Sequence, residues 1–224
     1  MQPIRGANLE QILGLKKDTT AAGKNFQRRV LTSCLMYKAA GIGLMEEIPV
    51  PFKIIGTVER GRLKGRHIVA EQPSSVDFSG WMLGVPTAIE CKSFREDRIE
   101  AGSGDRVFIH EHQLQFLEAW ERGPKPQYRF PGTLTVAFLL IELRKSGTMW
   151  AMRPAVYRSL IAGRKSIPLK MLRENQSAHG GTRGTFEIVP NQEPVDFAEF
   201  VVAAIREAGL HTTEPLSHPP TPQG

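Results

Sequence analysis

Cysteine is scarce in this chain, which has only Cys34 and Cys91 among its 224 residues. Two cysteines in a chain of this length do not form the disulfide framework of a small secreted protein. Long apolar runs are also missing, because stretches such as VAFLLI at 136–141 are far too short to cross a bilayer. The opening residues, MQPIRGANLEQ, lack the apolar core of a signal peptide. We therefore expect a soluble cytoplasmic protein in a reducing environment.

Basic residues outnumber acidic ones, 29 to 23, and give a formal net charge of +6. This balance favours a polyanionic partner such as nucleic acid. Residues 1–22 are polar and mixed and predict a flexible basic arm, whereas the proline-rich residues 210–224 predict a disordered tail. The part between them, 23–209, is long enough to bury the core of one domain.

Helical and extended patterns alternate through residues 23–209. Phe26, Val30, Cys34 and Tyr37 recur at helical spacing, whereas TLTVAFLLIEL is apolar on both faces, as a buried strand is. We expect further helices at 110–122, from Pro154 to Gly163 and after Asp196, and a polar loop at FREDRIEAGSGDR. The order predicts a mixed α/β fold with a central mixed sheet flanked by helices.

Three charges interrupt two apolar strand patterns. Asp77 lies in SSVDFSGWM, and Glu90 and Lys92 lie in PTAIECK. Because strand side chains alternate, Glu90 and Lys92 share one face, and antiparallel pairing of the strands brings Asp77 beside Glu90. Two adjacent carboxylates repel unless a cation joins them, and Mg²⁺ prefers such oxygens together with water. A lysine beside that water completes the groups needed for phosphodiester hydrolysis. The alternative is a surface strand with a cross-strand salt bridge.

Longer stretches resemble one nuclease family. SSVDFSGWMLGVPTAIECKS followed by FIHEHQLQFLEAW is similar to the RecU family of Holliday junction resolvases, which has the PD-(D/E)xK nuclease superfold. GKNFQRRV, GIGLMEEIPVPFKII and GRKSIPLKMLRE resemble other parts of the family in the same order, over about residues 23–205. The resemblance implies a restriction-endonuclease-like core and an endonuclease that resolves four-way junctions by paired nicking in recombination and repair.

The resemblance also assigns roles to residues. It implies Asp77 and Glu90 as metal ligands, Lys92 as the residue that orients or activates water, and Gln113 as a catalytic residue near the scissile phosphate. The backbone carbonyl of Cys91 is a further expected ligand, and Mg²⁺ is the expected ion, with Mn²⁺ as a substitute. One position departs from the family, since Gln27 stands where a glutamate is usual. An amide can still contact the metal or its water through oxygen, but it adds no negative charge.

A basic segment has a more specific implied role. Arg60, Arg62, Lys64 and Arg66 recur at every second residue, so one extended strand would place all four along one edge. In the resemblance this segment, about 53–72, is a projecting hairpin or stalk that would contact the phosphates of an open junction. The alternative is a solvated loop.

The resemblance further implies a homodimer, four-way junction DNA as the substrate, and a bacterial or phage source. A recombinase is another implied partner. Three alternatives stay open: a different PD-(D/E)xK endonuclease acting on duplex DNA, a junction-binding architectural protein that has lost cleavage, and a regulator of a recombinase. Neutral Gln27 keeps the second alternative open.

Overall fold

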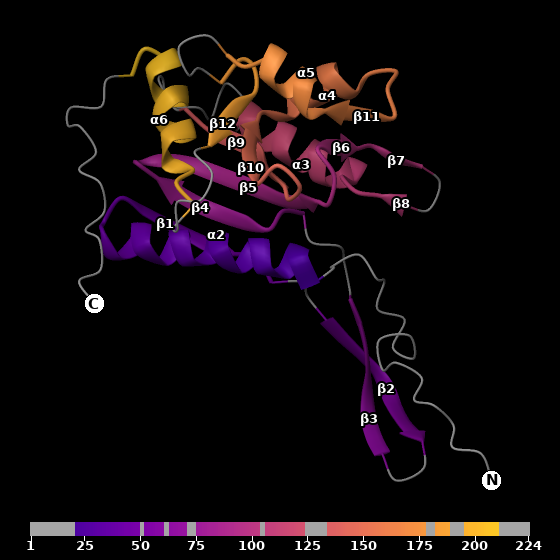
Figure 1. Cartoon of the computed structure of the whole chain (residues 1–224). Helices are drawn as coiled ribbons and strands as arrows, with labels where there is room; N and C mark the ends of the chain where they lie inside the picture. The colour runs from indigo at the N-terminus through magenta and orange to yellow at the C-terminus, as the bar shows by residue number, and fades with distance from the viewer. Residues whose placement is uncertain are drawn as a thin grey trace.

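A computed structural model describes residues 21–49, 52–60, 63–70, 75–103, 106–123, 134–177, 182–188 and 195–210. Residues 1–20 of the predicted basic arm and residues 211–224 of the predicted tail lie outside the described residues. Within them the predicted mixed α/β architecture is confirmed, since a six-stranded sheet is flanked by helices (Figure 1).

The sheet has the strand order β1-β4-β5-β9-β10-β12. Only the pairing of β5 with β9 is parallel, and the other four pairings are antiparallel. The central strand β9 is buried along almost its whole length, as its continuous apolar sequence predicts. The strands are β1 (Gly43–Glu47), β4 (Phe78–Met82), β5 (Val85–Phe94), β9 (Val136–Leu143), β10 (Thr148–Met152) and β12 (Phe186–Ile188).

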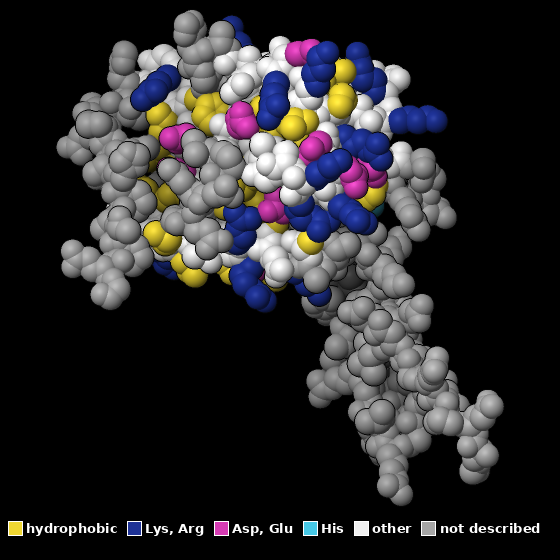
Figure 2. Space-filling view, in the orientation of Figure 1, with side chains coloured by type: hydrophobic (Ala, Val, Ile, Leu, Met, Phe, Trp, Pro, Cys, Tyr) yellow, Lys and Arg dark blue, Asp and Glu magenta, His cyan; other side chains and the backbone are white. Residues whose placement is uncertain are grey.

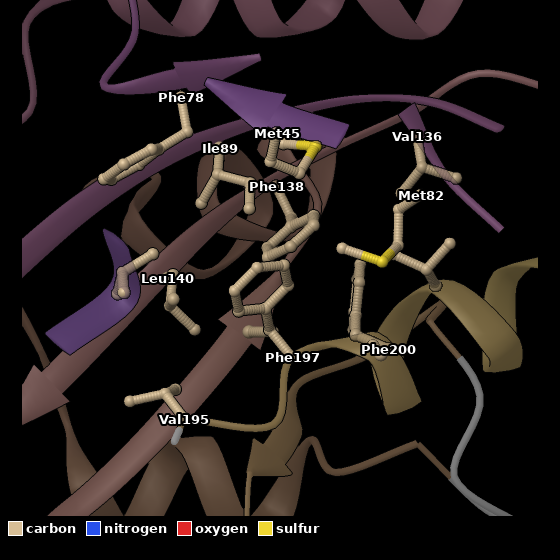
Figure 3. Packing of buried hydrophobic residues seen from close by; sticks show 14 of the residues in the cluster. Met45, Phe78, Met82, Ile89, Val136, Phe138, Leu140, Val195, Phe197 and Phe200 are labelled. Atoms are coloured by element: carbon tan, nitrogen blue, oxygen red, sulfur yellow. The ribbon is translucent and has the colours of Figure 1, made fainter. Parts of the chain in front are cut away.

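Helices α2 (Ala21–Ala39) and α6 (Ala198–Glu207) cover one face of the sheet. The predicted stripe of α2 is confirmed, because its four residues from Phe26 to Tyr37 are each at most 2% exposed. Gly41, with φ of 72°, follows the helix in the left-handed region that glycine adopts readily. Figure 3 shows Phe138 of β9 against Phe197 and Phe200, with the Phe138 and Phe200 ring centroids 4.7 Å apart. This aromatic packing fixes α6 on the sheet.

The opposite face is covered by α3 (Glu111–Arg122), α4 (Pro154–Ile161) and α5 (Leu169–Glu174). Helices α3 and α4 agree with the sequence prediction, whereas α5 was not foreseen. The segment expected to be a polar loop also contains strands, since β6 (Arg98–Glu100) pairs with β11 (Ser166–Pro168) and β7 (Gly102–Ser103) pairs with β8 (Arg106–Val107). Ile99 and Ile167 of the first pair are fully buried, so strand β6 depends on a partner strand that is distant in the sequence.

A separate hairpin joins β2 (Phe52–Arg60) to β3 (Leu63–Ala70). In Figure 1 it extends away from the sheet, as the resemblance implies for a stalk. One expectation is wrong: the basic residues do not alternate along a single strand, because the chain reverses after Arg60. The register pairs Arg60 with Leu63, and Lys64 and Arg66 lie on β3 opposite Glu59 and Thr57. Arg62 lies outside the described residues.

Candidate active site

Asp77 immediately precedes β4 and is fixed by backbone hydrogen bonds on both sides. Its N–H donates to the carbonyl of Ile89 on β5 at 3.1 Å, and its carbonyl accepts from the N–H of Ile48 at 2.8 Å. The pairing of Phe78 with Ile89 then sets Asp77 beside Glu90. The predicted approach of the two acids across antiparallel strands is therefore present in the structure.

The Asp77 carboxylate has a donor on each oxygen. The amide of Gln27 on α2 donates to Oδ1 at 2.7 Å, and the backbone N–H of Cys91 donates to Oδ2 at 2.8 Å. Burial raises the pKa of Asp77, although the Cys91 N–H and nearby Lys92 act in the opposite direction. Gln27 thus contacts the predicted site directly, through its amide nitrogen.

Glu90 is a buried acid, with only 1% of its surface exposed. Its Oε1 accepts a hydrogen bond from Gln113 Nε2 at 2.6 Å and lies 2.8 Å from Lys92 Nζ. Its Oε2 is also buried and has no hydrogen-bond partner among the described residues. Burial, followed by the nearby Asp77 charge, raises the pKa of Glu90 to about 8.

Gln113 reaches the site from the first turn of α3. Its side-chain oxygen accepts from the backbone N–H of His110 at 3.1 Å, which leaves its amide nitrogen directed at Glu90. Gln27 approaches from α2 on the other face of the sheet. The helical layers on both faces therefore each contribute one amide to a single pair of carboxylates.

The pair of acids suits a small divalent cation. The buried Glu90 carboxylate and the partly buried Asp77 carboxylate lie together with one cationic neighbour, and one Glu90 oxygen is unpaired within the described structure. Mg²⁺ commonly uses one or two carboxylates and keeps water at its other positions. The described residues contain no cluster of three or more His, Cys, Asp and Glu side chains suited to a metal. Asp77 and Glu90 are the two carboxylates of the described site that could hold such an ion.

Cys91 lies between the two site residues of β5, but its side chain belongs to the core. It is 5% exposed and packs in the cluster formed with α2 and α6. Burial raises the pKa of its thiol well above the ordinary range, which argues against a thiolate nucleophile. Its contribution to the site is a backbone one, through the N–H that binds Asp77.

Sequence reasoning missed one ion pair near this end of the sheet. Arg29 Nη1 donates to Glu142 Oε1 at 2.8 Å, and Ser93 Oγ donates to Glu142 Oε2 at 2.6 Å. The contact joins α2, β5 and β9 two residues along α2 from Gln27. A signal was present, since Glu142 is the only acid in the apolar strand VAFLLIEL. The partner on α2 could not be recognised without the tertiary structure.

Comparison with family models decides the relationship. The model described as Recombination protein U matches residues 21–187, which include every element of the site. The chain belongs to the RecU family. RecU proteins are Holliday junction resolvases, which are endonucleases of recombination, and their fold is of the PD-(D/E)xK type. A search of curated proteins finds no match. No helix in the described part of this RecU protein is long and apolar enough to cross a membrane.

The RecU site should make stability depend on pH. A carboxyl with a raised pKa binds its proton more tightly in the folded state than in the unfolded chain. The free energy of unfolding therefore falls as pH rises from the ordinary value of 4.5 to about 8. For metal-free protein in EDTA, we expect Glu90→Gln to reduce the loss of stability between about pH 5 and about pH 9. Urea unfolding at several pH values measures this.

Glu96→Gln is the matched control, because Glu96 is an acid just after β5 with 44% of its side chain exposed. It should keep the wild-type dependence on pH. If wild type and Glu90→Gln lose the same stability over this range, Glu90 does not have the raised pKa that its burial implies.

Proposed function

We propose that this RecU protein cuts four-way junctions by metal-dependent hydrolysis at Asp77, Glu90, Lys92 and Gln113. The observation that carries the proposal is the environment of Glu90. A carboxylate buried beside a second acid, with Lys92 and Gln113 on one oxygen and the other oxygen unpaired among the described residues, is costly for stability alone. Such an arrangement is typical of a site whose function needs the charge.

Mg²⁺ is the proposed ion, with Mn²⁺ as a substitute. Asp77, Glu90 and the backbone carbonyl of Cys91 would hold it, and Gln27 would lie beside it. When bound, the ion supplies charge neutralisation to the phosphate and lowers the pKa of water. The carboxylates of Asp77 and Glu90 would provide the negative charge that attracts a divalent cation.

Lys92 is the proposed residue that acts on the attacking water. Its ammonium is 2.8 Å from Glu90 Oε1, and 21% of its side chain is exposed, so it lies between the buried acid and solvent. From that position it would orient the water and help to remove its proton. Gln113 would hold Glu90 in place and approach the scissile phosphate from the N-terminal end of α3.

A homodimer is the proposed working form, because resolving a junction requires two nicks in strands related by two-fold symmetry. The hairpin of β2 and β3 would enter the open centre of the junction. Both ends of the hairpin are close to the candidate site along the chain, because Ile48 precedes the hairpin and residues 75 and 76 follow it. The backbone N–H of Ile48 donates a hydrogen bond to the carbonyl of Asp77. A recombinase is a further proposed partner.

The first test is the loss of either acid. Glu90→Gln and Asp77→Asn should each lower the cleavage of a labelled mobile four-way junction in Mg²⁺ by about a hundredfold or more, because metal catalysis contributes several kcal/mol. Junction binding should be retained, since it depends mainly on Lys and Arg. Glu96→Gln should cut as wild type does. Cleavage near the wild-type rate by either variant would refute the assignment of the site.

Gln27 allows a separate test of metal binding. Its amide donates to Asp77, whereas a glutamate there would add a third carboxylate. Gln27→Glu should therefore lower the Mg²⁺ concentration needed for half-maximal cleavage without changing the products. Titration of cleavage rate against Mg²⁺ measures the change. If wild type is inert and only Gln27→Glu cleaves, the chain is instead a junction-binding protein without nuclease activity.

The basic hairpin can be tested by its salt dependence. Changing Arg60, Arg62, Lys64 and Arg66 to alanine should weaken the binding of a four-way junction more than the binding of linear duplex, which has no open centre. Each lost phosphate contact should flatten the log–log salt dependence by about 0.9. Paired salt titrations on both substrates measure this. Equal losses would indicate a general electrostatic surface instead of a junction-specific hairpin.

A further inference from the structure

Phe108 is an aromatic residue that the family assignment does not explain. Its side chain is 40% exposed, although most large apolar residues of the described chain are buried. The ring is not isolated, because its centroid lies 5.6 Å from that of Phe94, which is only 5% exposed. Phe108 therefore presents part of an aromatic surface to solvent while its other side is held against the core.

The position of Phe94 relates this surface to the active site. Glu90, Lys92 and Phe94 occupy alternate positions of β5, so their side chains share one face of the strand. Four residues of strand span about 13 Å. This is the length of about four stacked nucleotides, at 3.4 Å each along one strand. A DNA strand cut at Glu90 can therefore bring a base within four nucleotides of the cut to Phe108.

The chain that follows Phe108 is firmly held. Ile109, the next residue, is 4% exposed and packs with Phe94 and Leu114 in one cluster. His110 follows as the N-cap of α3, and its N–H holds the Gln113 side chain that contacts Glu90. Four residues thus separate Phe108 from Gln113, whose side chain is hydrogen-bonded to the carboxylate of Glu90. The ring is pre-positioned relative to the active site, because no long flexible linker lies between them.

We propose that Phe108 is a specificity-determining residue whose exposed ring stacks on an unpaired base of the cleaved strand, within about four nucleotides of the scissile phosphate. The inference rests on the proposed function, since it takes Glu90 as the point of cleavage. Bases at the branch point of an open junction can unstack, whereas those of intact duplex are paired and stacked. The contact would therefore favour junctions over linear duplex.

A nucleobase fits this surface better than a protein partner does. Phe108 is a single ring near the site where DNA is cut, and a protein interface would require a contiguous apolar patch of several residues. Arg95, directly after Phe94 in the sequence, has 86% of its side chain exposed and lies 3.9 Å from Glu96. Proteins that bind single-stranded DNA combine aromatic rings with basic side chains.

The test uses junctions that carry 2-aminopurine at one position at a time, up to four nucleotides on either side of the cut. Binding is followed by fluorescence in Ca²⁺, and cleavage of the same junctions is measured in Mg²⁺. We expect wild type to alter the stacking signal at one position near the cut. Phe108→Leu, which keeps the apolar contact with Phe94 but has no aromatic ring, should lose this signal and lower junction cleavage about tenfold.

Phe108→Tyr should restore both readouts, because it keeps the ring. Trp81→Ala is the matched control, since Trp81 is an exposed aromatic residue at the other end of β4 from Asp77, with 56% exposure. It should behave as wild type in the stacking assay. Cleavage of linear duplex by Phe108→Leu should change much less than cleavage of the junction.

The possible outcomes separate this inference from the proposed function. If wild type cuts the junction and Phe108→Leu gives the same fluorescence and rate, the stacking role is refuted while the nuclease function stands. If Phe108→Leu changes the oligomeric state in analytical ultracentrifugation, the ring belongs to a protein interface and the proposal is also refuted. If wild type fails to cut junctions, the proposed function itself fails.

Discussion

The burial of the Glu90 carboxylate is the constraint on which the rest of the site depends. An acid on a central strand, covered by a helix, is stable only if its charge is matched by nearby donors or a cation, or is removed by protonation. Lys92 and Gln113 supply two of these contacts on one oxygen. These two contacts do not fully offset the burial and the nearby Asp77 charge, so the pKa of Glu90 stays raised. The buried carboxylate therefore lowers the stability of the fold, and the packing of the surrounding helices and strands has to hold it in place.

That support comes from both faces of the sheet. Helix α2 is fixed by its buried stripe and brings Gln27 to Asp77, and α3 is fixed by Leu114 and Leu117 and brings Gln113 to Glu90. The Arg29–Glu142 ion pair adds a polar contact between α2 and the end of β9. A partly buried ion pair of this kind is not by itself strong evidence for stability. Its geometric effect is clearer, because it restricts how α2 can move relative to the strands that carry the acids.

The positions of the β2–β3 hairpin and of Phe108 relative to the two carboxylates bear on how the shape of a DNA substrate could be recognised. The carboxylates lie at one end of the β4–β5 pair, and the chain enters and leaves the β2–β3 hairpin next to Asp77. Toward the same end of the sheet, β5 continues from Glu90 to Phe94, against which Phe108 packs. A nuclease that recognises shape needs contacts at a distance from the cut, since the scissile phosphate is the same in every DNA. In the proposed function, the β2–β3 hairpin and Phe108 would supply such contacts, both toward the end of the sheet that holds the candidate site.

The sequence by itself determined the elements that depend on local pattern. The helical spacing from Phe26 to Tyr37, the continuous apolar strand at β9 and the alternation of Glu90 with Lys92 were sufficient to predict α2, the central strand and the shared face of two site residues. The motifs from Ser74 to Trp120 also carried the resemblance to the RecU family, which the family comparison confirmed.

Only the tertiary structure decided what depends on contacts between distant segments. Strand β6 lies in a polar stretch that contains glycine, and its pairing with the distant β11 buries Ile99 and Ile167 together. The orientation of Gln27, which donates its amide to Asp77, could not be read from its place in the helix. Nor could the contact between Arg29 and Glu142, which are 113 residues apart. Local pattern selects helix or strand through backbone geometry, whereas the partner of a buried polar group is selected by the packing of the whole chain.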